Sequence, residues 1–294
     1  MKWRQGLLLL FFLFICLQTI IGREIISKSS KAGKINYLFI EWRHWNNTVV
    51  LGHFSNNQLN RIEEVVCDIN NLDEQVLSKW LKDPEQAALF SFHCMWGQQP
   101  WFHRMKYLSS FNEILSTTQQ PGIRTVISFI WHAGGINYKN NWNKAAGKGA
   151  FIGKSLAAIN QYYKKNSYIF CHSMGSRFFE GAFQSMPADQ DLFKAIILFS
   201  PDLPADIHQK EFKQIEKAAG AIVVFKHQKD KPLLLSSLML KCKRLGRSGP
   251  LPLVQGNKMI VYDMTGKVKG FQHHAHINKK WPKEKLVDFF NTKR

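Results

Sequence analysis

One serine lies in a backbone turn of the kind that makes a serine hydroxyl nucleophilic. Residues 171–175 read Cys-His-Ser-Met-Gly, between an apolar run at 168–171 and a helical pattern at 174–184. A serine between a strand and a helix sits on a strained backbone that lifts its hydroxyl clear of the sheet edge. Gly175 supplies one of the small residues needed two positions away, and Cys171 is small enough to replace the other. A serine at this place can simply cap a helix, but the full strand-turn-helix context indicates that Ser173 is a catalytic nucleophile.

Further landmarks occur in a fixed order along the chain, and the order is more specific than any one of them. They are Phe-Ser-Phe-His at 90–93 with Trp-Gly at 96–97, Ser-Phe-Ile-Trp at 128–131, the serine turn, Phe-Ser-Pro-Asp at 199–202 and a closing histidine region. With these landmarks, residues from about 87 to 290 resemble the α/β-hydrolase superfamily. They look closest to a poorly characterised group of bacterial hydrolases with a His-Ser-Met-Gly turn. The resemblance implies hydrolysis of an ester, thioester or amide through an acyl-enzyme.

A serine hydroxyl is a weak nucleophile until a base takes its proton. The superfamily places that base between its last strand and last helix, where His273, His274 and His276 occur. We expect His274 to be the base, with His273 and His276 as alternatives. Histidine-rich loops can also bind metals. A structural zinc site would need more ligands than this loop clearly offers, so we expect no metal.

The base needs a carboxylate that orients it, and two aspartates follow predicted strands. Asp230 comes after the run at 221–225, which is the commonest position of the acid in the superfamily. Asp202 follows the preceding strand and is the alternative acid, although an aspartate after Pro201 is also a frequent turn residue. The resemblance, rather than the spacing, favours Asp230.

The negative charge of the reaction intermediate needs backbone N–H donors. The Met174 amide lies at the start of the predicted helix and is the first candidate. In the superfamily the segment after strand three, commonly His-Gly, supplies the second donor. Cys94 stands where that glycine would be, so the resemblance points to the amide of Cys94 or Met95. This chemistry requires no metal and no organic cofactor.

The elements that must position these residues alternate along the chain. We expect strands at residues 35–42, 48–51, 87–92, 125–131, 168–171, 195–199, 221–225 and 259–262. We expect helices at 73–82, 101–115, 148–164, 174–184, 205–218 and 282–290, and a polar loop at 133–146. This alternation predicts an α/β fold with a mostly parallel central sheet and helices on both faces. No linker divides residues 35–294, so we expect one domain.

A glycine-rich stretch at residues 147–155 looks at first like a phosphate-binding loop. Such a loop needs four residues between its first glycine and Gly-Lys-Ser. Counting to the Gly-Lys-Ser at 153–155, Gly149 leaves three residues and Gly147 leaves five. The stretch is therefore not predicted to bind phosphate.

The N-terminus has the pattern of a targeting segment. Lys2 and Arg4 precede an apolar run at residues 7–21, so residues 1–22 are predicted to be a secretory signal peptide or an N-terminal membrane anchor. The run is slightly shorter than the ~20 residues that span a bilayer. Either reading predicts that residues 35–294 are exported, whether periplasmic, secreted or anchored facing outward.

The chain is strongly basic, with a formal net charge of +19. Loss of residues 1–22, which carry Lys2, Arg4 and no acid, would leave 38 basic and 21 acidic residues, or +17. Such an excess favours anionic partners. For an exported protein we expect a small-molecule or lipid-like ester substrate and an anionic membrane surface, and no nucleic acid. The alternative function is a non-catalytic binding protein on the same fold at an anionic envelope surface.

Overall fold

The computed structural model describes most of the chain from residue 36 onward, and all described residues lie in one compact unit, Gly33–Arg294. The predicted targeting segment at residues 1–22 and the predicted oxyanion residues Cys94 and Met95 lie outside the described residues. Within the part of the chain that the structure describes, no helix is both long and apolar enough to span a membrane. The described residues are 36–42, 48–54, 61–68, 78, 81, 84–92, 110–111, 113–118, 122–131, 137–186, 192–209, 212–252, 258–269 and 273–292.

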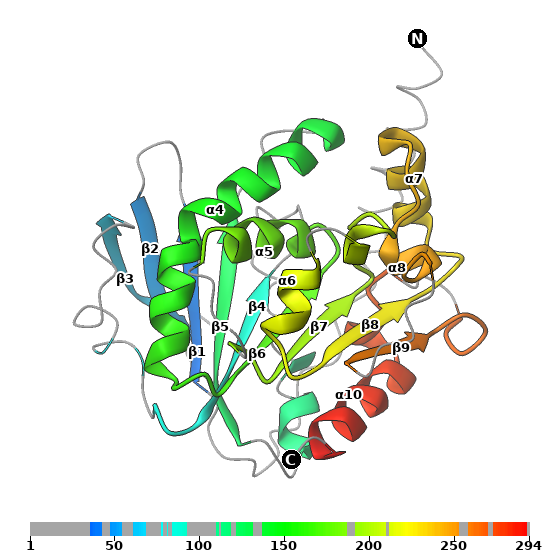
Figure 1. Cartoon of the computed structure of the whole chain (residues 1–294). Helices are drawn as coiled ribbons and strands as arrows, with labels where there is room; N and C mark the ends of the chain where they lie inside the picture. The colour runs from blue at the N-terminus through cyan, green and yellow to red at the C-terminus, as the bar shows by residue number, and fades with distance from the viewer. Residues whose placement is uncertain are drawn as a thin grey trace. The chain divides into compact units, whose positions relative to one another are not determined.

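A single sheet forms the middle layer, with strand order β3-β2-β1-β5-β4-β6-β7-β8-β9 (Figure 1). The seven strands from β1 to β9 in this order are parallel, and β2 and β3 extend the sheet with antiparallel pairing. The expected mostly parallel α/β architecture is therefore confirmed. The strands are β1 Asn36–Trp42, β2 Thr48–Phe54, β3 Arg61–Asp68, β4 Ala87–Phe92, β5 Ile123–Trp131, β6 Ser167–His172, β7 Ala195–Phe199, β8 Ile222–Lys226 and β9 Met259–Asp263.

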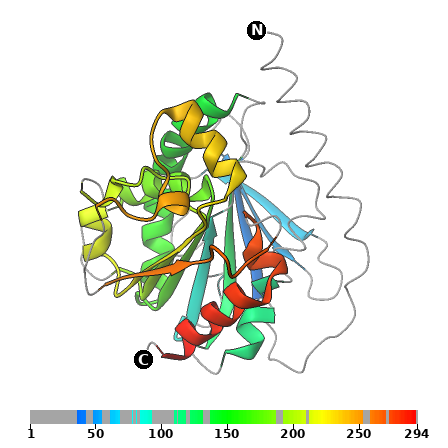
Figure 2. The same cartoon turned by 90° about the vertical axis from the view of Figure 1, so that its right-hand side faces the viewer.

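Helices cover both faces of this sheet (Figures 1 and 2). Alternate residues of β6 show the two faces: Ile169 and Cys171 belong to one apolar cluster, and Tyr168 and Phe170 belong to the other. Because both faces are covered, β4, β6 and β7 are buried along their whole length and read as continuous apolar runs. The helices are α4 Tyr138–Tyr162, α5 Gly175–Gln184, α6 Phe212–Lys217, α7 Lys231–Leu240, α8 Leu245–Ser248, α9 Ala275–Asn278 and α10 Lys280–Thr292, with a 3-10 turn at Ile207–Gln209.

Helix α4 begins at residue 138, ten residues before the predicted start at 148. The loop predicted at 133–146 is therefore wrong from residue 138 onward, where the chain is helical. Asn137 caps the helix, because its side chain accepts a hydrogen bond from the Asn140 amide. The first turns are then held by Tyr138 and Trp142, which both hydrogen-bond to Asp202. These long-range contacts offset the weak helix propensity of the asparagine-rich segment.

Glycines let α4 and α5 pack at very short range. A Cβ placed on Gly149 of α4 would lie 1.9 Å from the carbonyl oxygen of Phe178 in α5. A Cβ on Gly181 of α5 would lie 1.9 Å from the carbonyl oxygen of Ala146. The glycine-rich stretch therefore serves helix packing, and it holds in place the helix that follows Ser173.

Candidate active site

Ser173 occupies the tight turn between β6 and α5. Its backbone is in the left-handed region, with φ of 54°, which is unusual for a residue with a side chain. Three backbone hydrogen bonds of 3.1 Å hold it there: its N–H donates to Phe199, and its carbonyl accepts from Ser176 and Asp202. The side chain is nearly buried but retains 8% exposure. The neighbouring strands and helix thus fix the strained serine turn that the sequence predicts.

The residues two positions before and after Ser173 are small, and the residue that follows it is apolar. Gly175 is the first residue of α5, and Met174 occupies its N-cap position, so the Met174 amide lies at the positive end of the helix. Cys171 is fully buried among core side chains, and burial raises the pKa of its thiol well above the ordinary value. Cys171 therefore stays a neutral thiol that fills space, while the hydroxyl of Ser173 is the one that faces His273.

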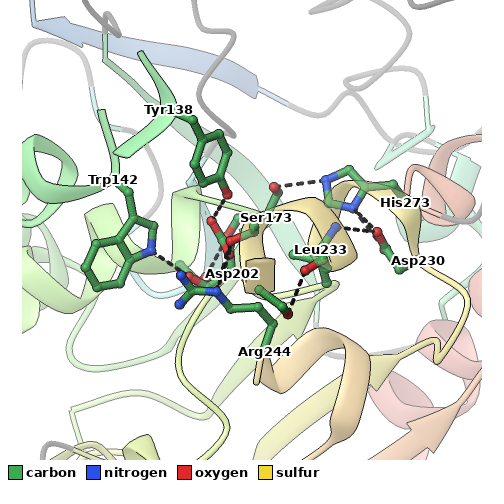
Figure 3. A network of polar contacts seen from close by, with 11 residues as sticks. Tyr138, Trp142, Ser173, Asp202, Asp230, Leu233, Arg244 and His273 are labelled. Atoms are coloured by element: carbon green, nitrogen blue, oxygen red, sulfur yellow. Dashed lines mark hydrogen bonds and ion pairs between the residues drawn. The ribbon is translucent and has the colours of Figure 1, made fainter. Parts of the chain in front are cut away.

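Ser173, His273 and Asp230 are hydrogen-bonded in series (Figure 3). The Oγ of Ser173 lies 2.9 Å from Nε2 of His273. On the other side of the ring, Nδ1 lies 2.9 and 3.1 Å from the two carboxylate oxygens of Asp230. An ionised carboxylate only accepts hydrogen bonds, so Nδ1 carries the proton and Nε2 is left to accept from the serine hydroxyl. This is the geometry in which an imidazole acts as a general base on a serine.

The structure places His273, and not the predicted His274, beside the Ser173 hydroxyl. The His274 ring packs against the ring of His172, with centroids 4.7 Å apart, and is nearly perpendicular to His273 at 5.2 Å. His276, the second alternative, is buried against the ring of Phe199 at 4.5 Å. Adjacent residues in a loop point in different directions, and the turn entering α9 directs only His273 at Ser173.

Asp230 is held rigidly where the resemblance placed the acid. It caps α7, since its Oδ1 accepts the amide of Leu233 at 3.0 Å, and its own amide donates to His227. Its side chain is fully buried. One carboxylate therefore both starts a helix and orients the imidazole, which fixes the ring of His273 against rotation.

Asp202, the alternative acid, belongs to a different network. Its Oδ1 accepts from Ser236 Oγ at 2.6 Å and pairs with Arg244 Nε at 3.2 Å, and its Oδ2 accepts from the Tyr138 hydroxyl. Burial raises the pKa of Asp202, against the lowering effect of Arg244 and of the hydrogen bonds from Ser236 and Tyr138. With both oxygens occupied, Asp202 does not orient His273. Its amide instead supports the carbonyl of Ser173 (Figure 3).

Sequence reasoning missed the residues of this support network. Trp142 donates to the Asp202 carbonyl at 3.0 Å, and the guanidinium groups of Arg177 and Arg244 lie over the Trp142 ring at 4.3 and 5.1 Å. Arg244 is fully buried, and the ion pair with Asp202 and the ring of Trp142 stabilise its charge there. Arg244 lies 71 positions after Ser173, and no local motif links the two.

His172 is a second missed residue, although it lies beside the nucleophile. Its Nε2 is 2.8 Å from the carbonyl oxygen of His273, and because a carbonyl only accepts, Nε2 must carry the proton. Burial lowers the pKa of His172 well below its usual value, and the neighbouring His276, His274 and His273 lower it further. His172 is therefore a neutral donor that holds the backbone of His273 and does not itself titrate near neutral pH.

The described residues contain no group of three or more His, Cys, Asp or Glu side chains placed to hold a metal ion. The arrangement that they do contain is suited to proton transfer. Its parts come from the carboxyl ends of three strands: Ser173 follows β6, Asp230 follows β8 and His273 follows β9. In parallel sheets these ends meet along one edge, which is how residues 100 positions apart come together.

A zinc-bound, cold-adapted esterase from an Arctic intertidal metagenomic library has a similar structure, with 14% identity and a TM-score of 0.41, over 72% of this chain and 83% of that one. No curated protein matches the sequence. The family of alpha/beta hydrolases of unknown function (DUF900) matches residues 101–259, which is more than half of the chain. The protein therefore belongs to this family of α/β hydrolases.

Proposed function

We propose that this protein is an exported serine hydrolase that cleaves an ester, thioester or amide through an acyl-enzyme. One observation carries the proposal. Ser173 Oγ is hydrogen-bonded at 2.9 Å to the imidazole of His273, and the other ring nitrogen of His273 is bonded to the buried carboxylate of Asp230. A non-catalytic binding protein on the same fold would need neither the strained serine nor a carboxylate behind the histidine. The geometry thus favours an enzyme over the binding-protein alternative.

In the first half of the reaction, Ser173 Oγ attacks the carbonyl carbon while its proton moves to Nε2 of His273. Asp230 stabilises the imidazolium that forms. As the tetrahedral intermediate collapses, His273 gives this proton to the leaving alcohol, thiol or amine, and the acyl group stays on Ser173. A water then attacks the acyl-enzyme with His273 again as base, which releases the acid and restores the serine.

The oxyanion of the intermediate would be held by backbone amides. Met174 is the first donor, because its amide lies at the N-terminal end of α5 directly after the nucleophile. The second donor is proposed to be the amide of Cys94 or Met95, in the segment that follows β4. Export is proposed on the basic and apolar pattern of residues 1–22.

The proposal predicts an acyl-enzyme on soluble, activated esters such as p-nitrophenyl acetate. Wild type should release nitrophenol, and a rapidly quenched sample should contain protein whose mass is raised by one acetyl group. Ser173→Ala should lose turnover by at least about a thousandfold and should carry no acetyl group. Ser237→Ala is a matched control, because the hydroxyl of this serine bonds to the carbonyl of Leu233 within α7, at 2.8 Å. Turnover by Ser173→Ala equal to wild type would refute the proposed nucleophile.

A further inference from the structure

Helix α7, residues Lys231–Leu240, exposes large apolar side chains, whereas an ordinary surface helix turns such side chains inward. Its inner side carries the buried Leu233 and Ser236, and the Ser236 hydroxyl donates to Asp202 at 2.6 Å. Its outer side carries Leu234, Leu238 and Met239, which are 40%, 68% and 39% exposed. We call these three residues the apolar face of α7. Leu234 and Leu238 are four residues apart and so project from the same side of the helix.

Positive charge surrounds the apolar face of α7. Exposed lysines lie just before the helix at Lys229, at its first residue Lys231, and after it at Lys241 and Lys243. Between residues 229 and 262 the sequence contains a single acid, Asp230, which is fully buried and bonded to His273. The neighbouring exposed charges of this segment are therefore all positive.

The position of α7 ties it to the candidate active site. The helix starts at Asp230, directly after β8, and its buried Ser236 joins the network that supports the Ser173 carbonyl. Figure 1 shows α7 on the side of the sheet to which the arrowheads of β7 and β8 point. A surface bound by α7 would thus lie at the sheet edge that carries Ser173.

We propose that the apolar face of α7 docks on an anionic lipid bilayer, with the leucines and methionine among the acyl chains and the flanking lysines on the headgroups. An interfacial helix of this kind combines exposed large apolar residues with lysines. A second copy of the chain is the less suitable partner. Pairing two such helices would bring the flanking lysines of both copies together, and these like charges repel in a chain of net charge +19. Delivery of lipid-borne esters to Ser173 would follow, and that consequence alone rests on the proposed hydrolase function.

The test is flotation of the full chain with vesicles of phosphatidylcholine, with and without phosphatidylglycerol. Wild type should bind the anionic vesicles more tightly than the neutral ones. Replacing all three residues of the apolar face with glutamine should weaken that binding at least about tenfold. Lys241→Glu should weaken it about fivefold, and Lys280→Glu by less than about twofold. These two variants change the charge equally, but Lys280 is on α10, which lies well away from α7 in both views (Figures 1 and 2).

Three results would overturn the docking surface. The first is unchanged binding of the triple variant, which would place the attachment elsewhere, such as at residues 1–22. The second is an equal loss of vesicle binding in Lys241→Glu and Lys280→Glu, which would show that binding depends on net charge and not on the lysines beside α7. The third is a wild-type dimer that the triple variant abolishes. Turnover of p-nitrophenyl acetate by the same preparations separates the two proposals: if wild type is inactive but binding depends on α7, the surface stands and the hydrolase function falls.

Discussion

Replacing His273 with glutamine is expected to lower kcat/KM on a soluble ester by at least about a thousandfold, because a glutamine amide cannot take the Ser173 proton as the imidazole does. His274→Gln, one residue away, is expected to keep activity within about threefold of wild type. The difference follows from geometry: Nε2 of His273 lies 2.9 Å from Ser173 Oγ, while the His274 ring packs on His172. Steady-state kinetics on p-nitrophenyl acetate measure both variants.

Thermal unfolding of the two histidine variants is the necessary control. Both residues adjoin the buried His172, so a general loss of folding would affect them alike. If the two variants fold equally well, their activities report on the chemistry. An inactive His274→Gln beside an active His273→Gln would mean that the loop before α9 presents a different histidine to the serine, and the assignment of the base would be wrong.

The second large effect is expected in stability, at the contact between α4 and α5. Gly149→Ala should lower the free energy of unfolding by at least about 2 kcal/mol, because the added methyl group overlaps a backbone carbonyl that has no room to yield. Its Cβ would lie 1.9 Å from Phe178 O and 2.8 Å from Ala182 N. Since α5 begins directly after Ser173, a displaced α5 should also reduce turnover. Urea unfolding followed by circular dichroism measures the change.

Gly147→Ala is the matched control for this substitution. Gly147 lies in the same helix, is exposed, and has nothing within 4 Å of an added Cβ. Alanine is the better helix former, so this variant should be more stable than wild type by about 0.5–1 kcal/mol. Equal stability of Gly149→Ala and wild type would show that the two helices are not in close contact at this point.

The parts of the site that depend on local sequence could be predicted. Ser173 is marked by the strand, the turn and the helix around it, all within residues 167–184, and the structure has the same elements there. Asp230 likewise follows a strand of clear apolar character, although it was the resemblance to the superfamily that favoured it over Asp202. Signals of this kind need no knowledge of distant contacts.

The choice between His273 and His274 depends on contacts that no local pattern records. Two neighbouring histidines have the same chemistry, and only the direction of the loop separates them. That direction is fixed by the bond from His172, which lies 101 positions earlier in the chain. Sequence order alone therefore identifies the region that contains the base, and it cannot identify which histidine of that region faces Ser173.

The start of α4 and the whole of α7 escaped prediction because tertiary contacts outweigh local propensity. The start of α4 reads as a polar loop, yet Tyr138 and Trp142 tie it to Asp202. Helix α7 was not expected at all, because it buries a serine and exposes two leucines and a methionine. Its inward serine is explained by the buried Asp202 and Arg244, which come from distant parts of the chain.

Labelling of the folded protein by a fluorophosphonate, followed by peptide mapping, tests the central claim most directly. Such probes react with a serine only when a neighbouring base makes it nucleophilic. The account predicts one adduct per wild-type chain, located on Ser173, and none on Ser173→Ala under the same conditions. A folded wild type that stays unlabelled, or an adduct on a serine other than Ser173, would contradict it.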